Sequence, residues 1–174
     1  MGRIIINNTI RFIILIMLQV ALFKNIGYYN LATPFPYILF LFLLPIGVPN
    51  LLLYVIAFLT GLTVDAFYDT IGVHAAACVA LVWFRVFFHK ITLEADVINS
   101  FETPLWSEMG FKWYSTYILL GTLVHHLALY FVEVFSFQNI LYTLASVGLS
   151  SIFTIVVIFI IGILTYKRKS RLGN

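Results

Sequence analysis

The sequence predicts an all-α integral membrane protein, a single domain built as a bundle of six transmembrane helices. Of its 174 residues, 62% are hydrophobic and 10% are charged. The mean hydropathy is +1.03, which lies far outside the range of soluble domains. The few charges also divide the chain into long uncharged blocks, which is the pattern of spanning segments joined by short polar loops.

These blocks predict six spans, at residues 9–23, 34–44, 50–67, 72–88, 111–133 and 140–166. The first two are shorter than the ~20 residues with which a helix crosses a bilayer upright. The first must therefore draw on residues 4–8 or let Arg11 reach the interface. The second could instead be re-entrant, and Pro45 and Pro49 break the apolar pattern after it, where a turn fits.

The distribution of lysine and arginine predicts the orientation in the membrane. If both termini lie in the cytoplasm, nine of the ten basic residues lie on that side, and only Lys24 lies outside. The basic tail at residues 167–171 directly follows the last span. We expect it to bind anionic lipid head groups rather than nucleic acid, for which it is too short.

The longest polar segment is the inner loop at residues 89–110. Thr103 and Pro104 resemble a helix N-cap followed by proline at the first helical position, so a short helix is expected to begin there. One interpretation is a surface helix anchored by tryptophan at the inner interface. The other is a docking site for a cytoplasmic protein, with the contact residues Leu105, Trp106 and Met109.

The third and fourth spans carry small residues at helical spacing. In the third span, Ala57, Gly61 and Asp65 recur every four residues and share one face. The fourth span has the same spacing in Gly72, Ala76 and Ala80. We expect the two spans to pack as an antiparallel hairpin through these faces. Asp65 would either cap the turn at residues 69–73 or recognise a neighbouring helix or ligand.

A polar stripe in the fifth span consists of Thr122, His126 and Glu133. Hydrogen bonding between helices is the favoured role, with a proton relay and a metal site as alternatives. A metal is disfavoured because His125 and His126 are adjacent, whereas helical histidine ligands need a spacing of four residues and a third ligand. Arg85 is expected to extend to the inner interface, with a role as a buried partner as the alternative.

Enzyme signatures are missing from the sequence. It contains no G-x-S-x-G elbow, H-E-x-x-H pair or glycine-rich phosphate loop. With four of the seven acidic residues in the inner loop, little acid–base chemistry remains for the spans. We therefore expect a protein that is not an enzyme and that needs no cofactor or metal.

The hairpin contains a G-L-x-x-D pattern at Gly61, Leu62 and Asp65, a short turn, and a G-x-H-A pattern that contains Gly72 and His74. In these motifs it resembles the MreD family of rod shape-determining proteins. This resemblance implies a multi-pass protein of the bacterial inner membrane that serves side-wall peptidoglycan synthesis and cell shape. It also implies a fold similar to the S components of energy-coupling-factor transporters.

The same resemblance implies the partners. MreD proteins bind the single-pass protein MreC, and through it they connect to MreB, RodA and a class B penicillin-binding protein. The resulting hypothesis is a membrane scaffold that uses the small-residue face near Gly61 and Asp65 to hold the bundle or a partner helix. The alternative is a small-solute-binding membrane subunit of a transporter, with Asp65, His74 and Glu133 around an outer pocket.

Overall fold

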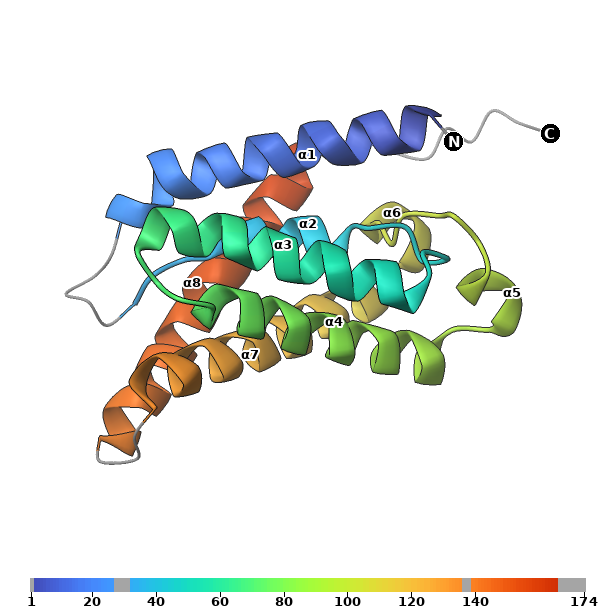
Figure 1. Ribbon diagram of the computed structural model, residues 1–174. Helices are drawn as coiled ribbons and strands as arrows, with labels where there is room; N and C mark the ends of the chain where they lie inside the picture. The colour runs from blue at the N-terminus through green and yellow to red at the C-terminus, as the bar shows by residue number, and fades with distance from the viewer. Residues whose placement is uncertain (1, 27–31, 136–138, 166–174) are drawn as a thin grey trace.

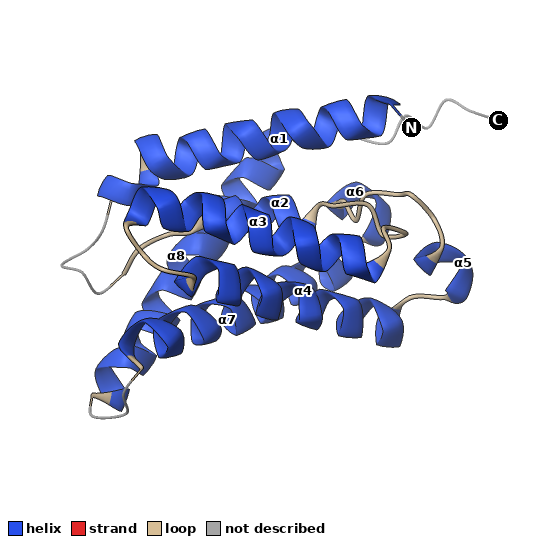
Figure 2. Cartoon of the chain, viewed as in Figure 1, coloured by secondary structure: helices blue, strands red, loops and turns tan. Residues whose placement is uncertain are grey.

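The structure is a computed structural model that describes residues 2–26, 32–135 and 139–165, and the regular elements in these ranges are helices (Figure 2). Five of them are long and apolar enough to cross a membrane (Figure 1). They are α1 (Gly2–Ala21, continued by η1, Phe23–Asn25), α3 (Asn50–Tyr68), α4 (Val73–Thr92), α7 (Phe111–Val134) and α8 (Ile140–Leu164). The chain is therefore a multi-pass membrane protein, and the predicted all-helical class is confirmed.

The second predicted span, at residues 34–44, is not a spanning helix, which corrects the prediction of six. Extended chain leads into η2 (Pro36–Ile38) and α2 (Leu39–Phe42), of three and four residues. That is about 10 Å of helix, against a hydrocarbon core of ~30 Å. Prolines cause this shortening, because Pro34 and Pro36 stand at its start and Pro45 follows its end.

Residues 32–49 nevertheless connect the two ends of the bundle, and we call them the discontinuous segment. In Figure 1 the segment returns from the far end of α1 through the middle of the molecule, and α3 begins at the end where α1 began. Helices α3, α4, α7 and α8 then alternate in direction. The described chain thus passes between the two ends six times, and only the second passage is not a long helix.

The discontinuous segment is also the centre of the core. Every residue from 34 to 46 is buried, and Tyr37, Ile38, Leu41 and Phe42 have no exposed surface. Around it, α3 packs on α4, α4 on α7, and α7 on α8, whereas α1 lies against η2 and α2 and only lightly against α3. The segment therefore replaces a missing helix as the common contact of the bundle.

The inner loop contains α5 (Ala95–Ile98) and α6 (Trp106–Met109). Helix α6 begins later than Thr103 predicts, because Leu105 still has extended dihedral angles of −83° and 153°. The loop pairs with the turn of the discontinuous segment, since Ile46 N donates to Glu102 O at 2.9 Å and Gly47 N to Ser100 O at 2.7 Å. The predicted lipid-binding tail at residues 167–171 lies outside the described residues.

Candidate functional site

The extended start of the discontinuous segment is bound by side chains from other helices. Thr33 N donates to Ser150 Oγ at 3.0 Å, and Phe35 N donates to Thr154 Oγ1 at 2.9 Å. On the other side, Gln19 Nε2 donates to the carbonyl of Pro34 at 3.2 Å. Non-helical backbone inside a membrane protein needs such partners, because no water is present to satisfy its polar groups. Helices α1 and α8 supply them here.

The C-terminal end of α2 and the turn that follows it are held mainly by Arg85, a residue of α4 that is 1% exposed. Its guanidinium donates to the backbone carbonyls of Leu41, Phe42, Leu44 and Pro45. Tyr117 Oη donates to Phe42 O at 3.3 Å, and Arg11 Nη1 donates to Leu43 O at 2.9 Å. These carbonyls lie at a helix C-terminus, where they have no helical partner and where a cation is favourable. The expectation that Arg85 extends to the interface is therefore wrong.

Tyr37 forms the middle of the polar core. Its hydroxyl lies 3.1 Å from His74 Nδ1, 3.0 Å from His125 Nε2 and 3.5 Å from Cys78 Sγ. The neighbouring Phe35 ring packs on both histidines, with centroid distances of 5.2 and 6.4 Å. Tyr37 therefore fastens the discontinuous segment to α4 and α7 together.

Asp65 caps the next helix of the hairpin. Its carboxylate accepts hydrogen bonds from His74 N at 2.9 Å, Ala75 N at 3.0 Å and Thr70 Oγ1 at 2.5 Å. Gly72, which precedes α4, has no side chain that could satisfy these amides. Asp65 is 3% exposed and serves as a cap supplied from a distance, which is the first of the two roles considered for it.

Gly61 brings α3 and α4 into backbone contact. A Cβ atom at this position would lie 2.3 Å from the Cα of Ala75, which leaves room for glycine alone. Ala57 on the same face is fully buried, whereas Leu62 is 38% exposed on the outside. The small residues near Gly61 are therefore buried in the contact between α3 and α4.

The predicted face of α4 is wrong by one residue. Ala76 is exposed and Gly72 and Ala80 are half-buried, whereas Ala75 and Ala77 are buried. The reason lies in the turn between the helices, where Asp69 and Gly72 have positive φ angles of 56° and 78°. Together with the Asp65 cap, this turn rotates α4 so that Ala75 faces Gly61.

The polar stripe of α7 divides into two parts. Thr122 and His126 are fully buried, and His126 contacts Thr122 O at 2.8 Å and Thr154 Oγ1 at 3.1 Å. Glu133 is exposed on the last turn of α7 and does not join them. Within the described ranges, no three His, Cys, Asp or Glu side chains are placed to hold one metal ion.

The inner-loop residues proposed for docking have unequal surroundings. Trp106 is half-buried, with its ring centroid 4.9 Å from Phe111 and 6.3 Å from Phe159 of α8. Leu105 is 39% exposed. Met109 lines a hollow of about 500 Å³ together with Glu94, Glu102 and Glu108. Trp106 thus anchors the loop on the bundle, while Leu105 faces outward.

Several residues of this core were missed by reasoning on the sequence. Gln19, Tyr37 and Tyr117 carry no motif, and their partners lie 15 to 88 residues away along the chain. The available signal was Gln19, an amide in an otherwise apolar block. No protein-family model, curated protein or solved structure matches the chain. Its function is therefore argued from this core.

Proposed function

We propose that the protein is a non-enzymatic, MreD-like scaffold of the bacterial cell-elongation machinery. In this role it binds the single-pass protein MreC in the inner membrane. It thereby connects to MreB, RodA and a class B penicillin-binding protein during side-wall peptidoglycan synthesis. One observation carries the proposal: the buried side chains of Gln19, Asp65, Arg85, Ser150 and Thr154 hydrogen-bond to the protein's own backbone.

An enzyme or a solute-binding subunit needs polar groups that converge on a space for its substrate. In this chain the carboxylate of Asp65 accepts hydrogen bonds from two backbone amides and a hydroxyl. The guanidinium of Arg85 donates hydrogen bonds to four backbone carbonyls. His74 is bonded to Tyr37. This arrangement favours a rigid bundle over a reaction or transport site.

The MreD-like pattern also has a structural meaning in this hairpin. Gly61 permits the close approach of α4, Gly72 adopts the positive φ angle of the turn, and Asp65 caps α4. Helix faces outside the hairpin then remain for partners. On α8, for example, Ile152 and Ile163 are each 62% exposed.

The described cations support an orientation with both termini in the cytoplasm. Arg3 lies in the first turn of α1, Lys90 in the last turn of α4 and Lys112 in the first turn of α7. These three helix ends lie at one end of the bundle (Figure 1), and Lys24 follows the opposite end of α1. Positive charge is retained on the cytoplasmic side. The basic tail at residues 167–171 would meet anionic lipid there.

The test is capture of MreC from cells that express the tagged protein. We expect the wild type and Asp69→Asn to capture MreC and to support rod shape, and Asp65→Asn and Gly61→Leu to do neither. If both hairpin variants insert, fold and support shape and capture normally, the hairpin does not carry the function. If the wild type captures no MreC and its depletion leaves cell shape unchanged, the scaffold proposal is wrong.

The same preparation tests the solute-binding alternative. That reading needs Asp65, His74 and Glu133 around one outer pocket, but the first two are buried and bonded and the third is exposed. A vitamin-like solute bound by the purified protein, together with dependence on an ATPase module, would favour it over the scaffold.

A further inference from the structure

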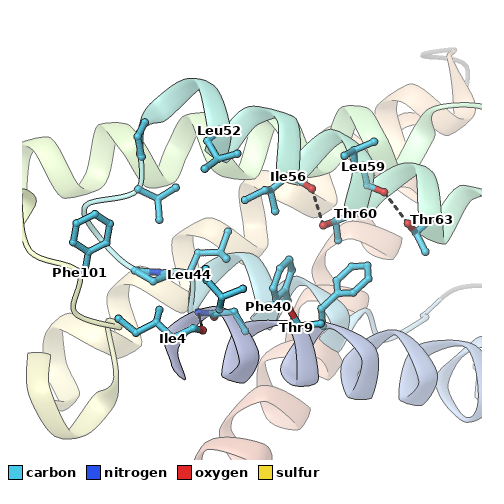
Figure 3. Close-up of a pocket in the computed structure, with 16 residues that line it drawn as sticks. Ile4, Thr9, Phe40, Leu44, Leu52, Ile56, Leu59, Thr60, Thr63 and Phe101 are labelled. Atoms are coloured by element: carbon cyan, nitrogen blue, oxygen red, sulfur yellow. Dashed lines mark hydrogen bonds between the residues drawn. The ribbon is translucent and has the colours of Figure 1, made fainter. Parts of the chain in front are cut away.

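Two hollows of similar volume differ in what lines them. The lateral groove between α1 and α3, of about 560 Å³, is lined mainly by apolar side chains (Figure 3). The hydroxyls of Thr60 and Thr63 also line it, but they donate to carbonyls of their own helix, at 2.7 and 2.8 Å. Such a surface selects no single occupant, because acyl chains and helices both cover apolar side chains in a membrane.

The other hollow, of about 500 Å³, lies at the inner loop and is acidic. Its lining combines carboxylates with an apolar floor, in Glu94, Glu102, Glu108, Val97, Met109 and Trp113. The indole of Trp113 is fixed in place, because its Nε1 donates to Thr92 Oγ1 at 3.1 Å. This combination suits lysine and arginine, whose charged ends pair with carboxylates while their stems cover apolar surface. We call this site the acidic hollow.

The inner loop and the basic tail carry equal and opposite charge. Residues 93–109 contain four acidic residues and no lysine or arginine, whereas residues 167–171 contain four basic residues and no acidic one. The anionic head groups of an inner leaflet repel the first of these segments and attract the second. A contact between the two segments neutralises the loop at the surface where its charge is least favourable.

The tail begins beside the inner loop. The ring of Phe159 on α8 packs on Trp106 of α6 and on Phe111, the first residue of α7, with centroid distances of 6.3 and 6.2 Å. Helix α8 continues to Leu164, about 7.5 Å further at 1.5 Å per residue. Helix α6 also supplies two residues of the acidic hollow. An extended chain over residues 165–171 spans about 20 Å, which is enough to reach it.

We propose that the basic tail at residues 167–171 binds in the acidic hollow of the same chain. Its lysine and arginine side chains pair with Glu94, Glu102 and Glu108, and one of their stems lies on the ring of Trp113. The contact ties the end of α8 to the inner loop.

The tether favours this occupant over a basic segment of another protein, because it gives the tail an effective concentration of about a millimolar. The proposal does not depend on the scaffold function, since both partners belong to this chain. It competes with the binding of the tail to anionic lipid, which is therefore one outcome of the test.

Disulfide cross-linking of the full chain in nanodiscs tests the contact, in a Cys78→Ala background. Ser170→Cys places a thiol in the tail without removing a cation, and Val97→Cys places the second thiol in the acidic hollow. The matched control is Ala95→Cys on the same helix, α5, because Ala95 is exposed and lies outside the lining. A tail that moves freely would favour the more exposed Ala95→Cys. We expect instead a preference for Val97→Cys of about fivefold or more.

One substitution inside the acidic hollow and one outside it test the role of charge. Glu102→Gln should lower the cross-linking of Val97→Cys about threefold, as for the loss of one exposed ion pair. Asp96→Asn lies in the same loop but outside the lining and should leave the yield unchanged. Trypsin cleavage of the tail in the chain without added cysteines is the second measurement, and it serves even if the Cys78→Ala background does not fold. Glu102→Gln should speed this cleavage about threefold, because docking protects the tail, and Asp96→Asn should not.

Three outcomes would overturn the proposal. Ala95→Cys could cross-link as well as Val97→Cys, or Glu102→Gln and Asp96→Asn could give equal cross-linking and equal cleavage. In the third, the Val97→Cys cross-link forms in phosphatidylcholine nanodiscs but not in phosphatidylglycerol nanodiscs, which would assign the tail to anionic lipid.

Discussion

Asp65→Asn is the sharpest test of how the hairpin is held. The carboxylate accepts from His74 N through Oδ1 and from Ala75 N through Oδ2. An asparagine has the same shape but only one acceptor oxygen, and its NH₂ group would face a backbone N–H. At least one amide at the start of α4 therefore loses its partner while it remains buried.

The size of the effect follows from those bonds. A hydrogen bond to a charged group contributes about 1.5–3 kcal/mol, although side-chain bonds inside membrane proteins average only ~0.6 and reach ~1.7 kcal/mol. We expect Asp65→Asn to lower the free energy of unfolding by about 2 kcal/mol, because an amide is left without a partner. That corresponds to about a thirtyfold shift in the folding equilibrium.

The assay is reversible unfolding in mixed detergent micelles, followed by circular dichroism, with Asp69→Asn as the control. Asp69 lies in the same turn, is exposed, and has a φ angle of 56° that asparagine tolerates well. Its substitution makes the same change of charge and should alter stability by less than about 0.5 kcal/mol. Equal unfolding midpoints for the two variants would refute the capping role of Asp65.

Substitutions of three further residues test other contacts in the same assay. Gly61→Ala should destabilise by about 1–3 kcal/mol, because its Cβ overlaps the α4 backbone, whereas Gly162→Ala, with nothing within 4 Å, should not; equal stability of the two would contradict this contact. Thr154→Val keeps the side-chain shape but removes the acceptor for Phe35 N and the partner of His126 Nε2, so a loss of about 1–3 kcal/mol is expected, and no loss would show that these two bonds are unimportant. For Arg85, stability should fall in the order wild type, Lys, Met, because a lysine cannot reach four carbonyls at once; a methionine variant as stable as the wild type would refute this role.

The sequence allowed prediction of those parts of the fold that depend on local signals. Five of the six predicted spans correspond to long helices, and the closely spaced residues Gly61, Asp65 and Gly72 marked a tight hairpin. The rotation of α4 could not be predicted by helical spacing alone. It depends on two residues with positive φ in the turn, and only one of them, Gly72, is a glycine.

The sequence showed that residues 34–44 are too few for an upright span and could be re-entrant, but it did not predict the path of the discontinuous segment through the core. Its apolar residues look like those of a spanning helix, and only their small number and the flanking prolines argue otherwise. What stabilises its extended backbone is supplied from other helices, such as Thr154, which is 119 residues from Phe35. For the same reason Arg85 looked like an interfacial residue, since nothing near it in the sequence indicates four carbonyl partners.

The dependence of residues 32–49 on α8 has a consequence for biosynthesis. Thr33 precedes its acceptor Ser150 by 117 residues, so at ~5–20 residues per second the ribosome needs about 6–23 s to deliver that acceptor. Until then the backbone amides of Thr33 and Phe35 lack their acceptors on α8. An unpaired backbone amide in the hydrocarbon core of a membrane costs several kcal/mol. We therefore expect the extended backbone of residues 32–49 to reach its final hydrogen bonding only after α8 has been synthesised.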